Sequence, residues 1–445
     1  MVHKVYLETM GCIKNRVDSE IMIGALVRDG FQFTSTPQEA EIITINTCGF
    51  IEKAVVESID RILQLAHYKT LGTCKKLIVA GCLSERYRDR LLEEIPEIDA
   101  LLGSSDFTQI SVVINSILTE RSQMQFLDAR PQYSSRNQSV DRALSTTCYA
   151  YVKIAEGCSN MCSFCNIPKL RGGFKSREII SIVDECNKLL NQHIKEINLI
   201  SQDSSSYGVD LPDDINLLRL VRQILSKSDT DFWLRIFYSY PNRYPLELFS
   251  LMNEDDRLTP YVDMPFQHIS DSVLNAMNRK IQAEDIRKII DTAFNAKEDI
   301  TFRTTFMVGF PNETEKDFQE LVDFVGNGFF RHIGVFTYSN EDNIPSSKYG
   351  DPIPLEVKEE RRKILLEKQQ SISYGKNRAN VGQIQKVLVE GTYEETELLL
   401  KGRNCNQGPE VDGLVLINGG QANAGEFNTV RITEAHPYDL VGEII

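Results

Sequence analysis

The sequence predicts an α/β protein with three parts: a doubly wound parallel sheet, a partial (βα)6 barrel of the TIM type, and a small antiparallel β-barrel. Three observations lead to this prediction. Short apolar strands alternate with helical patterns in the first part, six further strand-like segments are separated by helices, and five short strands punctuated by glycines come last. We place the three domains at residues 1–120, 144–374 and 377–445.

In the first domain, three apolar strand segments are each followed by a cysteine. They lie within residues 5–12, 42–48 and 77–82, with helical patterns at 19–28 and 54–65 between them. The carboxyl ends of parallel strands meet at one edge of a sheet, where ligands bind. We therefore expect Cys12, Cys48 and Cys82 to converge, although any one of them alone could be only a small buried apolar side chain.

Four other cysteines provide a comparison. Cys74 and Cys148 precede their strands, which places them at the opposite edge, whereas Cys186 lies in a helical pattern and Cys405 in a late loop. We predict that these four are structural or incidental.

The middle domain alternates strands and helices. We expect strands at residues 151–155, 196–201, 232–238, 261–265, 300–308 and 332–338, and helices that include 179–191, 217–226, 284–296 and 315–325. Chemistry in such a barrel takes place at the carboxyl ends of the strands. Candidate catalytic residues there are Gln202, Asp203 and His268, and candidate cofactor-binding residues are Gln202, Gly309 and Glu313. Asp203 and His268 could instead be structural, and Arg303 could point either into the barrel or outward.

A loop after the first of these strands carries Cys158, Cys162 and Cys165 in the spacing C-x3-C-x2-C. Three thiolates can hold three irons of a [4Fe–4S] cube and leave the fourth iron open, as a metal site does when it must bind a further ligand. A zinc site is the alternative, but no histidine or cysteine follows at the spacing of a fourth zinc ligand.

The last domain is acidic. Strands expected at 384–392, 396–402, 414–418, 429–434 and 440–445 predict an OB-like barrel. Residues 377–445 carry ten acidic and five basic side chains, a net charge of −5. Because Lys and Arg supply affinity for a phosphate backbone, we expect a basic protein partner rather than direct nucleic-acid binding. The charged segment 358–363, in a helix expected at 355–374, is interpreted as a solvated face.

Composition indicates a soluble globular protein. The 445 residues are 42% hydrophobic and 25% charged, with a net charge of −14. We find no apolar run of about 18 residues that would cross a membrane, and no apolar core of a signal peptide at the start. We therefore expect a cytoplasmic location, in which cysteines are reduced and clustered ones favour metal binding over disulfides.

These features together resemble the methylthiotransferases of the radical S-adenosylmethionine (SAM) superfamily, and the last domain resembles a TRAM domain. The C-x3-C-x2-C spacing resembles the superfamily's signature, and Cys12, Cys48 and Cys82 match the family's auxiliary-cluster ligands. One branch of the family modifies a tRNA base beside the anticodon, and the other an aspartate of protein S twelve of the small ribosomal subunit. The second branch is favoured by the acidic barrel and by segments 238–241, 260–268, 303–306, 334–339, 409–413 and 438–442.

The resemblance implies two [4Fe–4S] clusters, with SAM as both radical source and methyl donor. Cys158, Cys162 and Cys165 would hold the cluster that cleaves SAM to form a radical, which takes hydrogen from the substrate's β-carbon, and the auxiliary cluster would present the sulfur. Phe164 would pack near the adenine or, alternatively, serve as a core aromatic of the loop. Implied partners are a basic ribosomal protein, an electron-donor protein and a sulfur source. A tRNA methylthiotransferase and, less favoured, a non-catalytic metal-binding interaction protein are the alternatives.

Overall fold

The structure, a computed structural model, describes residues 3–119, 123–127, 142–212, 214–342 and 344–445. The chain forms two compact units. The first comprises Met1–Ser145, Ala155–Asn160 and Cys165–Arg177, and the second comprises Thr146–Ile154, Met161–Phe164 and Glu178–Ile445. The three domain boundaries expected from the sequence stay a prediction.

The first unit contains a six-stranded, entirely parallel sheet in the order β2-β1-β3-β4-β5-β6. The strands are β1 (Lys4–Thr9), β2 (Gln32–Phe33), β3 (Ile42–Thr47), β4 (Lys76–Gly81), β5 (Ala100–Leu102) and β6 (Met124–Phe126). Every residue of β3 is buried, as expected of a central strand covered on both faces. The predicted doubly wound parallel sheet is confirmed.

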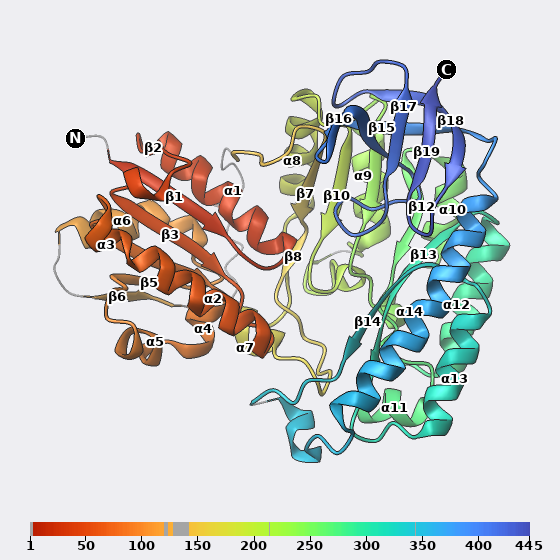
Figure 1. The fold of residues 1–445 in the computed structure, drawn as a ribbon, viewed down its shortest axis with the longest axis horizontal. Coiled ribbons are helices and arrows are strands. Elements are labelled where there is room, and N and C mark those ends of the chain that lie inside the picture. The colour runs from red at the N-terminus through yellow and green to blue at the C-terminus, as the bar shows by residue number, and fades with distance from the viewer. Residues whose placement is uncertain (1–2, 120–122, 128–141, 213, 343) are drawn as a thin grey trace. The chain divides into compact units, whose positions relative to one another are not determined.

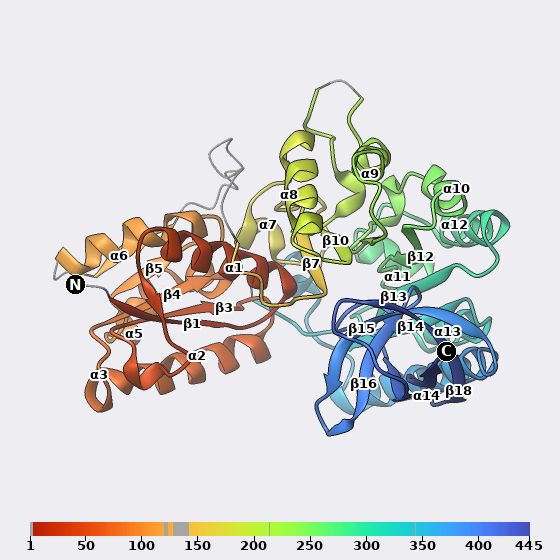
Figure 2. The ribbon, with the colours of Figure 1, turned by 90° about the horizontal axis from the view of Figure 1, so that it is seen from above.

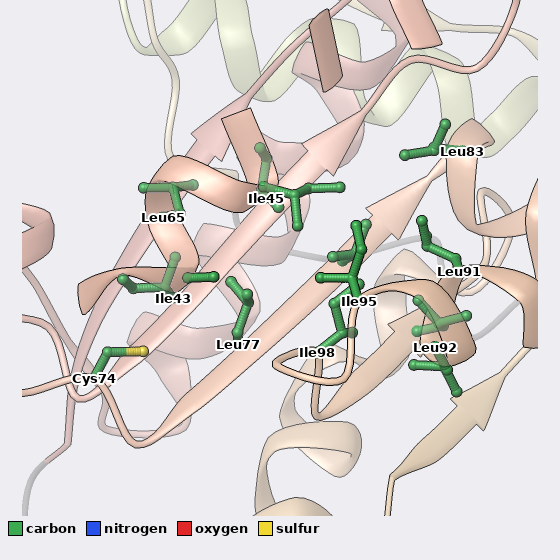
Figure 3. Close-up of a cluster of buried hydrophobic side chains, with 14 of the residues drawn as sticks. Ile43, Ile45, Leu65, Cys74, Leu77, Leu83, Leu91, Leu92, Ile95 and Ile98 are labelled. Atoms are coloured by element: carbon green, nitrogen blue, oxygen red, sulfur yellow. The ribbon is translucent and has the colours of Figure 1, made fainter. Parts of the chain in front are cut away.

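Helices cover both faces of this sheet (Figure 1). On one face, α1 (Ile13–Arg28) and α6 (Ile110–Thr119) share a core with alternate strand residues. On the other, α2 (Glu52–Ala66), α4 (Cys82–Tyr87) and α5 (Asp89–Glu94) pack over the cluster shown in Figure 3. The short elements α3 (Tyr68–Leu71), β8 (Ala155–Glu156), α7 (Ile167–Arg171) and β9 (Lys175–Ser176) complete the unit.

The second unit begins with a half-barrel of six parallel strands in the order β7-β10-β11-β12-β13-β14. They are β7 (Tyr149–Lys153), β10 (Glu196–Ile200), β11 (Trp233–Ile236), β12 (Leu258–Asp263), β13 (Thr301–Val308) and β14 (Phe330–Thr337). The connecting helices are α8 (Ile179–Asn191), α9 (Leu217–Ser226), α10 (Glu247–Glu254), α11 (Asp271–Ala276), α12 (Ala283–Ala296) and α13 (Glu315–Gly326). The repeated strand–helix order confirms the partial (βα)6 barrel.

A long helix, α14 (Leu355–Arg378), lies along β14 (Figure 1). The prediction of a solvated face over 358–363 is wrong for two of its residues. Lys358 is buried and its Nζ donates to the carbonyl of Tyr338 at 3.0 Å, while buried Arg361 lies 3.4 Å from a Glu313 carboxylate oxygen. Both charges are drawn inward by acceptors distant in the chain, which the local pattern does not reveal.

The C-terminal strands curl into a closed five-stranded barrel (Figure 2). They are β15 (Ile384–Tyr393), β16 (Thr396–Asn404), β17 (Val415–Gly419), β18 (Phe427–Ala435) and β19 (Leu440–Ile444). All neighbouring pairs are antiparallel except β17 with β19, which is parallel. A ring with an odd number of strands cannot alternate direction throughout, so closure itself requires one parallel pair.

Buried ion pairs join this barrel to the half-barrel within the second unit. Glu196 on β10 accepts from Arg235 at 2.8 Å and from Arg403 of β16 at 2.6 Å, and all three side chains are fully buried. Burial alone would raise the pKa of Glu196, but the positive charges of Arg403 and Arg235 keep that pKa below its ordinary value. Arg303, whose direction the sequence left open, pairs with Asp263 at 3.1 Å and with Asp412 at 3.4 Å.

None of the helices in the described part of the chain combines the length and apolar character needed to cross a membrane.

We expect Glu196→Gln to lower the free energy of unfolding by about 3–5 kcal/mol, because it leaves two buried guanidinium groups without their shared carboxylate. Urea unfolding would measure this change. The matched control is Glu443→Gln, because Glu443 pairs with Arg431 on an exposed surface and such pairs contribute at most about 1 kcal/mol. Equal effects of the two substitutions would contradict the stabilising role of the buried pair.

Candidate functional site

Three cysteines follow three neighbouring strands of the parallel sheet. Strand β3 lies between β1 and β4, with Thr9 paired to Asn46 and Thr47 paired to Gly81 at their carboxyl ends. Cys12 is the N-cap residue of α1, Cys48 follows β3, and Cys82 begins α4. The structure therefore brings these three residues to the same edge of the sheet, as the sequence predicts.

Two glycines allow the cysteine-bearing turns to touch. A methyl group added to Gly11, whose φ is +86°, would lie 2.7 Å from Cβ and 3.3 Å from Sγ of Cys48. One added to Gly49 would lie 2.9 Å from the backbone carbonyl of Cys82. Only glycine lets the backbone approach its neighbours this closely. The first turn thus contacts the second, and the second contacts the third.

The three thiols influence one another electrostatically. The pKa of Cys82 is raised to about 11 and that of Cys48 is also raised, in both cases mainly by burial and in part by the nearby Cys12 thiol. The positive charge of Arg171 opposes these effects and lowers the pKa of both Cys82 and Cys48. Without metal the buried thiols therefore favour their neutral form, so binding of a metal centre must displace their protons.

Arg171, at the end of α7, is a site residue that sequence reasoning missed. It is 2% exposed, and its Nη2 donates to Oδ1 of Asn15 at 2.5 Å. Its Nη1 lies 3.0 Å from a Glu156 carboxylate oxygen and 3.4 Å from one of Asp18. The pattern Arg-Gly-Gly after the cysteine loop suggests only a turn, and no periodicity marks this arginine as buried.

The thiols fit an iron–sulfur cluster in their chemistry and convergence. No three His, Cys, Asp or Glu side chains among the described residues are arranged to hold a single metal ion. The ligands of a cube are spaced differently, because each thiolate binds a separate iron. Cys82 is buried, Cys48 half-buried and Cys12 exposed, so this thiol set extends from the interior to the surface of the first unit.

The C-x3-C-x2-C loop places its three cysteines in ordered surroundings. Cys158 and Cys162 are buried and Cys165 is half-buried. The backbone N–H of Cys158 donates to the carbonyl of Gly172 at 3.1 Å. In the second unit, Nη1 of Arg279 lies 3.7 Å from Sγ of Cys162, within the range of an N–H···S hydrogen bond. The guanidinium carbon of Arg279 also lies over the ring of Tyr240, 4.0 Å from the ring centroid, and this cation–π contact helps to hold the guanidinium in place.

The candidate residues of the half-barrel lie beyond the ends of their strands. Gln202 is half-buried after β10, and the buried Asp203 accepts from the hydroxyl of Ser206 at 2.6 Å. His268 is completely buried after β12, its Nδ1 accepting from the backbone of Ser270 at 3.0 Å. Its Nε2 lies 3.7 Å from a carboxylate oxygen of Glu313, so the structure brings these two predicted residues together.

Three further candidates have protein neighbours of their own. Glu313 accepts from the backbone of Gly309 and pairs with Arg361, and Gly309 packs against the side chain of Lys358. Phe164 packs on a small apolar cluster. These contacts explain why the residues are ordered, while their roles toward a cofactor or substrate stay predictions.

The comparison cysteines have the surroundings that a structural role requires. Cys74 packs in the core of the parallel sheet, and its thiol lies 3.4 Å from the carbonyl of Lys76 (Figure 3). Cys186 is buried in α8. Cys148 precedes β7 and contacts Thr147, and Cys405 is half-buried beside Asn406.

Family models match three parts of the chain. "Uncharacterized protein family UPF0004" matches residues 4–103, "Radical SAM superfamily" residues 152–325, and "TRAM domain" residues 381–445. The second match includes the whole C-x3-C-x2-C loop and most of the half-barrel. The chain is thus a radical SAM enzyme with an additional N-terminal domain that carries the second set of thiols.

Curated relatives identify the family more closely. The chain is 43% identical to "Ribosomal protein uS12 methylthiotransferase RimO" of Syntrophotalea carbinolica, over 99% of this chain and 97% of that one. It is 42% identical to the protein of the same name from Geobacter sulfurreducens, over 99% of this chain and 98% of that one. The chain belongs to the RimO family of radical SAM methylthiotransferases.

Solved structures share the fold at low sequence identity. The radical SAM methyltransferase TsrM from Kitasatospora setae, with tryptophan and a SAM analogue bound, aligns with a TM-score of 0.56 and 14% identity. That alignment covers 75% of this chain and 73% of TsrM. The cobalamin-dependent radical enzyme OxsB aligns with a TM-score of 0.51 over 82% of this chain and 56% of its own.

We expect Gly49→Ala to reduce the iron bound after anaerobic reconstitution by about half, because the new methyl group would push the Cys48 turn away from Cys82. Iron and sulfide analysis would measure the loss. Gly375→Ala is the matched control: Gly375 lies in α14 with no atom near its added methyl, so iron content should not change. Full iron content in the Gly49→Ala variant would show that iron binding does not require the close contact between these turns.

Proposed function

We propose that this protein transfers a methylthio group to the β-carbon of an aspartate in protein uS12 of the small ribosomal subunit. The names of its relatives point to that substrate. The observation in this chain that carries the proposal is the convergence of Cys12, Cys48 and Cys82 in addition to a complete C-x3-C-x2-C loop. Radical formation requires only the thiols of the C-x3-C-x2-C loop, and the separate set of Cys12, Cys48 and Cys82 offers a place for the sulfur.

Two [4Fe–4S] clusters and SAM, when bound, supply a radical able to break an unactivated C–H bond, together with the sulfur and the methyl group. Cys158, Cys162 and Cys165 would hold one cluster. Cys12, Cys48 and Cys82 would hold the other. The chain's own contribution is to hold and shield these groups. Arg279 donates toward Cys162, and burial of Cys158 and Cys162 limits the access of water.

The acidic C-terminal barrel supports a basic protein substrate. Glu394, Glu395 and Glu397 are exposed around the turn between β15 and β16, and residues 377–445 carry twice as many acidic as basic side chains. Opposite charges attract a partner and speed encounter. An electron-donor protein and a sulfur source are further partners in this proposal, and a cytoplasmic location would follow from a ribosomal substrate.

Mass spectrometry of protein uS12 from cells with and without the gene tests the substrate. We expect one aspartate to carry a methylthio group only when the gene is present. The tRNA fraction of the same cells is analysed in parallel. Methylthiolated tRNA with an unmodified ribosomal protein would contradict the proposal and select the tRNA branch of the chemistry.

The two sets of cysteines should separate the two halves of the reaction. Cys158→Ala should abolish release of 5′-deoxyadenosine, because one ligand of the SAM-binding cluster is lost. Cys82→Ala should retain that release and form no methylthiolated product. Chromatography of 5′-deoxyadenosine and mass spectrometry of the peptide product measure the two outcomes.

Cys74→Ala is the control for these variants, because its thiol lies in the sheet core away from the convergent edge. It should keep its iron and its product formation. Normal product formation by Cys82→Ala, or loss of a cluster from Cys74→Ala, would refute the assignment of the auxiliary thiols.

A further inference from the structure

Arg171 is one of the largest fully buried side chains of the chain, and its surroundings are unusual for a charge in a protein interior. Taking a guanidinium out of water is costly unless carboxylates and hydrogen bonds compensate for it. Here, Asp18 and Glu156 provide the charges, at 3.4 and 3.0 Å from Nη1, and Asn15 provides an uncharged acceptor. This cation is therefore held in one position.

Arg171 and its partners flank two cysteine-bearing segments: the SAM-cluster loop, defined as Cys158–Cys165, and the turn at Cys12. Glu156 lies two residues before Cys158, and Arg171 itself lies six residues after Cys165. Asn15 and Asp18 lie in the first two turns of α1, which begins directly after Cys12. All of these segments belong to the first unit. One guanidinium thus joins the base of the SAM-cluster loop to the helix that carries an auxiliary thiol.

The same guanidinium acts on the auxiliary thiols. Oδ1 of Asn15, which accepts from Arg171 at 2.5 Å, lies 3.9 Å from Sγ of Cys12, and the positive charge of Arg171 lowers the pKa of the Cys82 thiol. Asn15, which accepts from Arg171, also donates to the carbonyls of Met10 and Thr47, at 3.0 Å each. Arg171 therefore supports the two strand ends from which Cys12 and Cys48 project, and it places positive charge near the Cys12 thiol.

We propose that Arg171 is a positioning residue for the auxiliary cluster, holding its thiols together and providing the fixed positive charge that makes the cluster easier to reduce. This inference rests on the proposed function, because it assumes that Cys12, Cys48 and Cys82 hold a cluster. One-electron reduction adds one negative charge to the cluster and breaks no bond in the protein. A nearby cation stabilises the reduced form, and hydrogen bonds to the sulfurs act in the same direction.

The test uses the full-length chain with Cys158, Cys162 and Cys165 each changed to Ala, so that only the auxiliary cluster is present. After anaerobic reconstitution, its midpoint potential is measured by redox titration followed by electron paramagnetic resonance. In this background Arg171→Met should lower the potential by at least about 59 mV, which is a tenfold change in a one-electron equilibrium. Arg171→Lys should recover part of the loss, because it restores charge without the planar fork.

Asp18→Asn is the counterpart, because it removes a negative charge while leaving Arg171 its contacts with Glu156 and Asn15. It should shift the potential upward. If Arg171→Met fails to bind iron, this variant still tests the inference, because an unchanged potential in Asp18→Asn would show that the charges around Arg171 do not act on the cluster. Arg235→Met, at a buried arginine of the half-barrel, is the control and should leave the potential unchanged.

An unchanged potential in Arg171→Met, or shifts of the same sign in Arg171→Met and Asp18→Asn, would overturn the inference while leaving the proposed function intact. Failure of the proposed function has a different signature. If the background protein with intact Cys12, Cys48 and Cys82 binds no iron, the auxiliary site itself is refuted, and the role of Arg171 with it.

Discussion

Neighbouring strands of a parallel sheet all end at the same edge, and the convergence of Cys12, Cys48 and Cys82 depends on this constraint. It brings together cysteines that are more than 30 residues apart in the chain. Asn15 maintains the arrangement, because its side-chain amide donates to the carbonyls of Met10 and Thr47 at the ends of β1 and β3. The backbone of Asn15 in turn accepts from Asn46 at 2.9 Å. The cysteine-bearing turns are thus held by ordinary hydrogen bonds before any metal binds.

Buried charge is the second feature that organises the molecule. Among the residues that the structure describes, Arg171, Arg235 and Arg403 are the three largest side chains that are fully buried, and each contacts at least one carboxylate. Such pairs add little net stability compared with apolar packing, but breaking one is expensive. They therefore select which segments pack together. Arg171 holds the cysteine loop against α1, and Arg403 holds the last barrel against β10.

Much of the fold could be predicted because its patterns are local. The apolar periodicity of α8 and α9 gives their observed bounds, Ile179–Asn191 and Leu217–Ser226, and the parallel-sheet rule separates Cys82 from Cys74. The buried charges could not be predicted in this way. Lys358 and Arg361 have the local sequence of a solvated face, and only acceptors on other elements show that they point inward.

The sequence by itself determined that the three thiols of the C-x3-C-x2-C loop lie near one another, since the chain separates them by at most seven positions. It also determined that three strand-end cysteines share one edge, through a rule of topology. Only the tertiary structure decided that Gly11 lies against Cys48 and Gly49 against Cys82, and that Arg171 donates to Asn15 next to these turns. Those contacts depend on side chains far apart in sequence that packing brings within a few ångströms, and no local pattern encodes that distance.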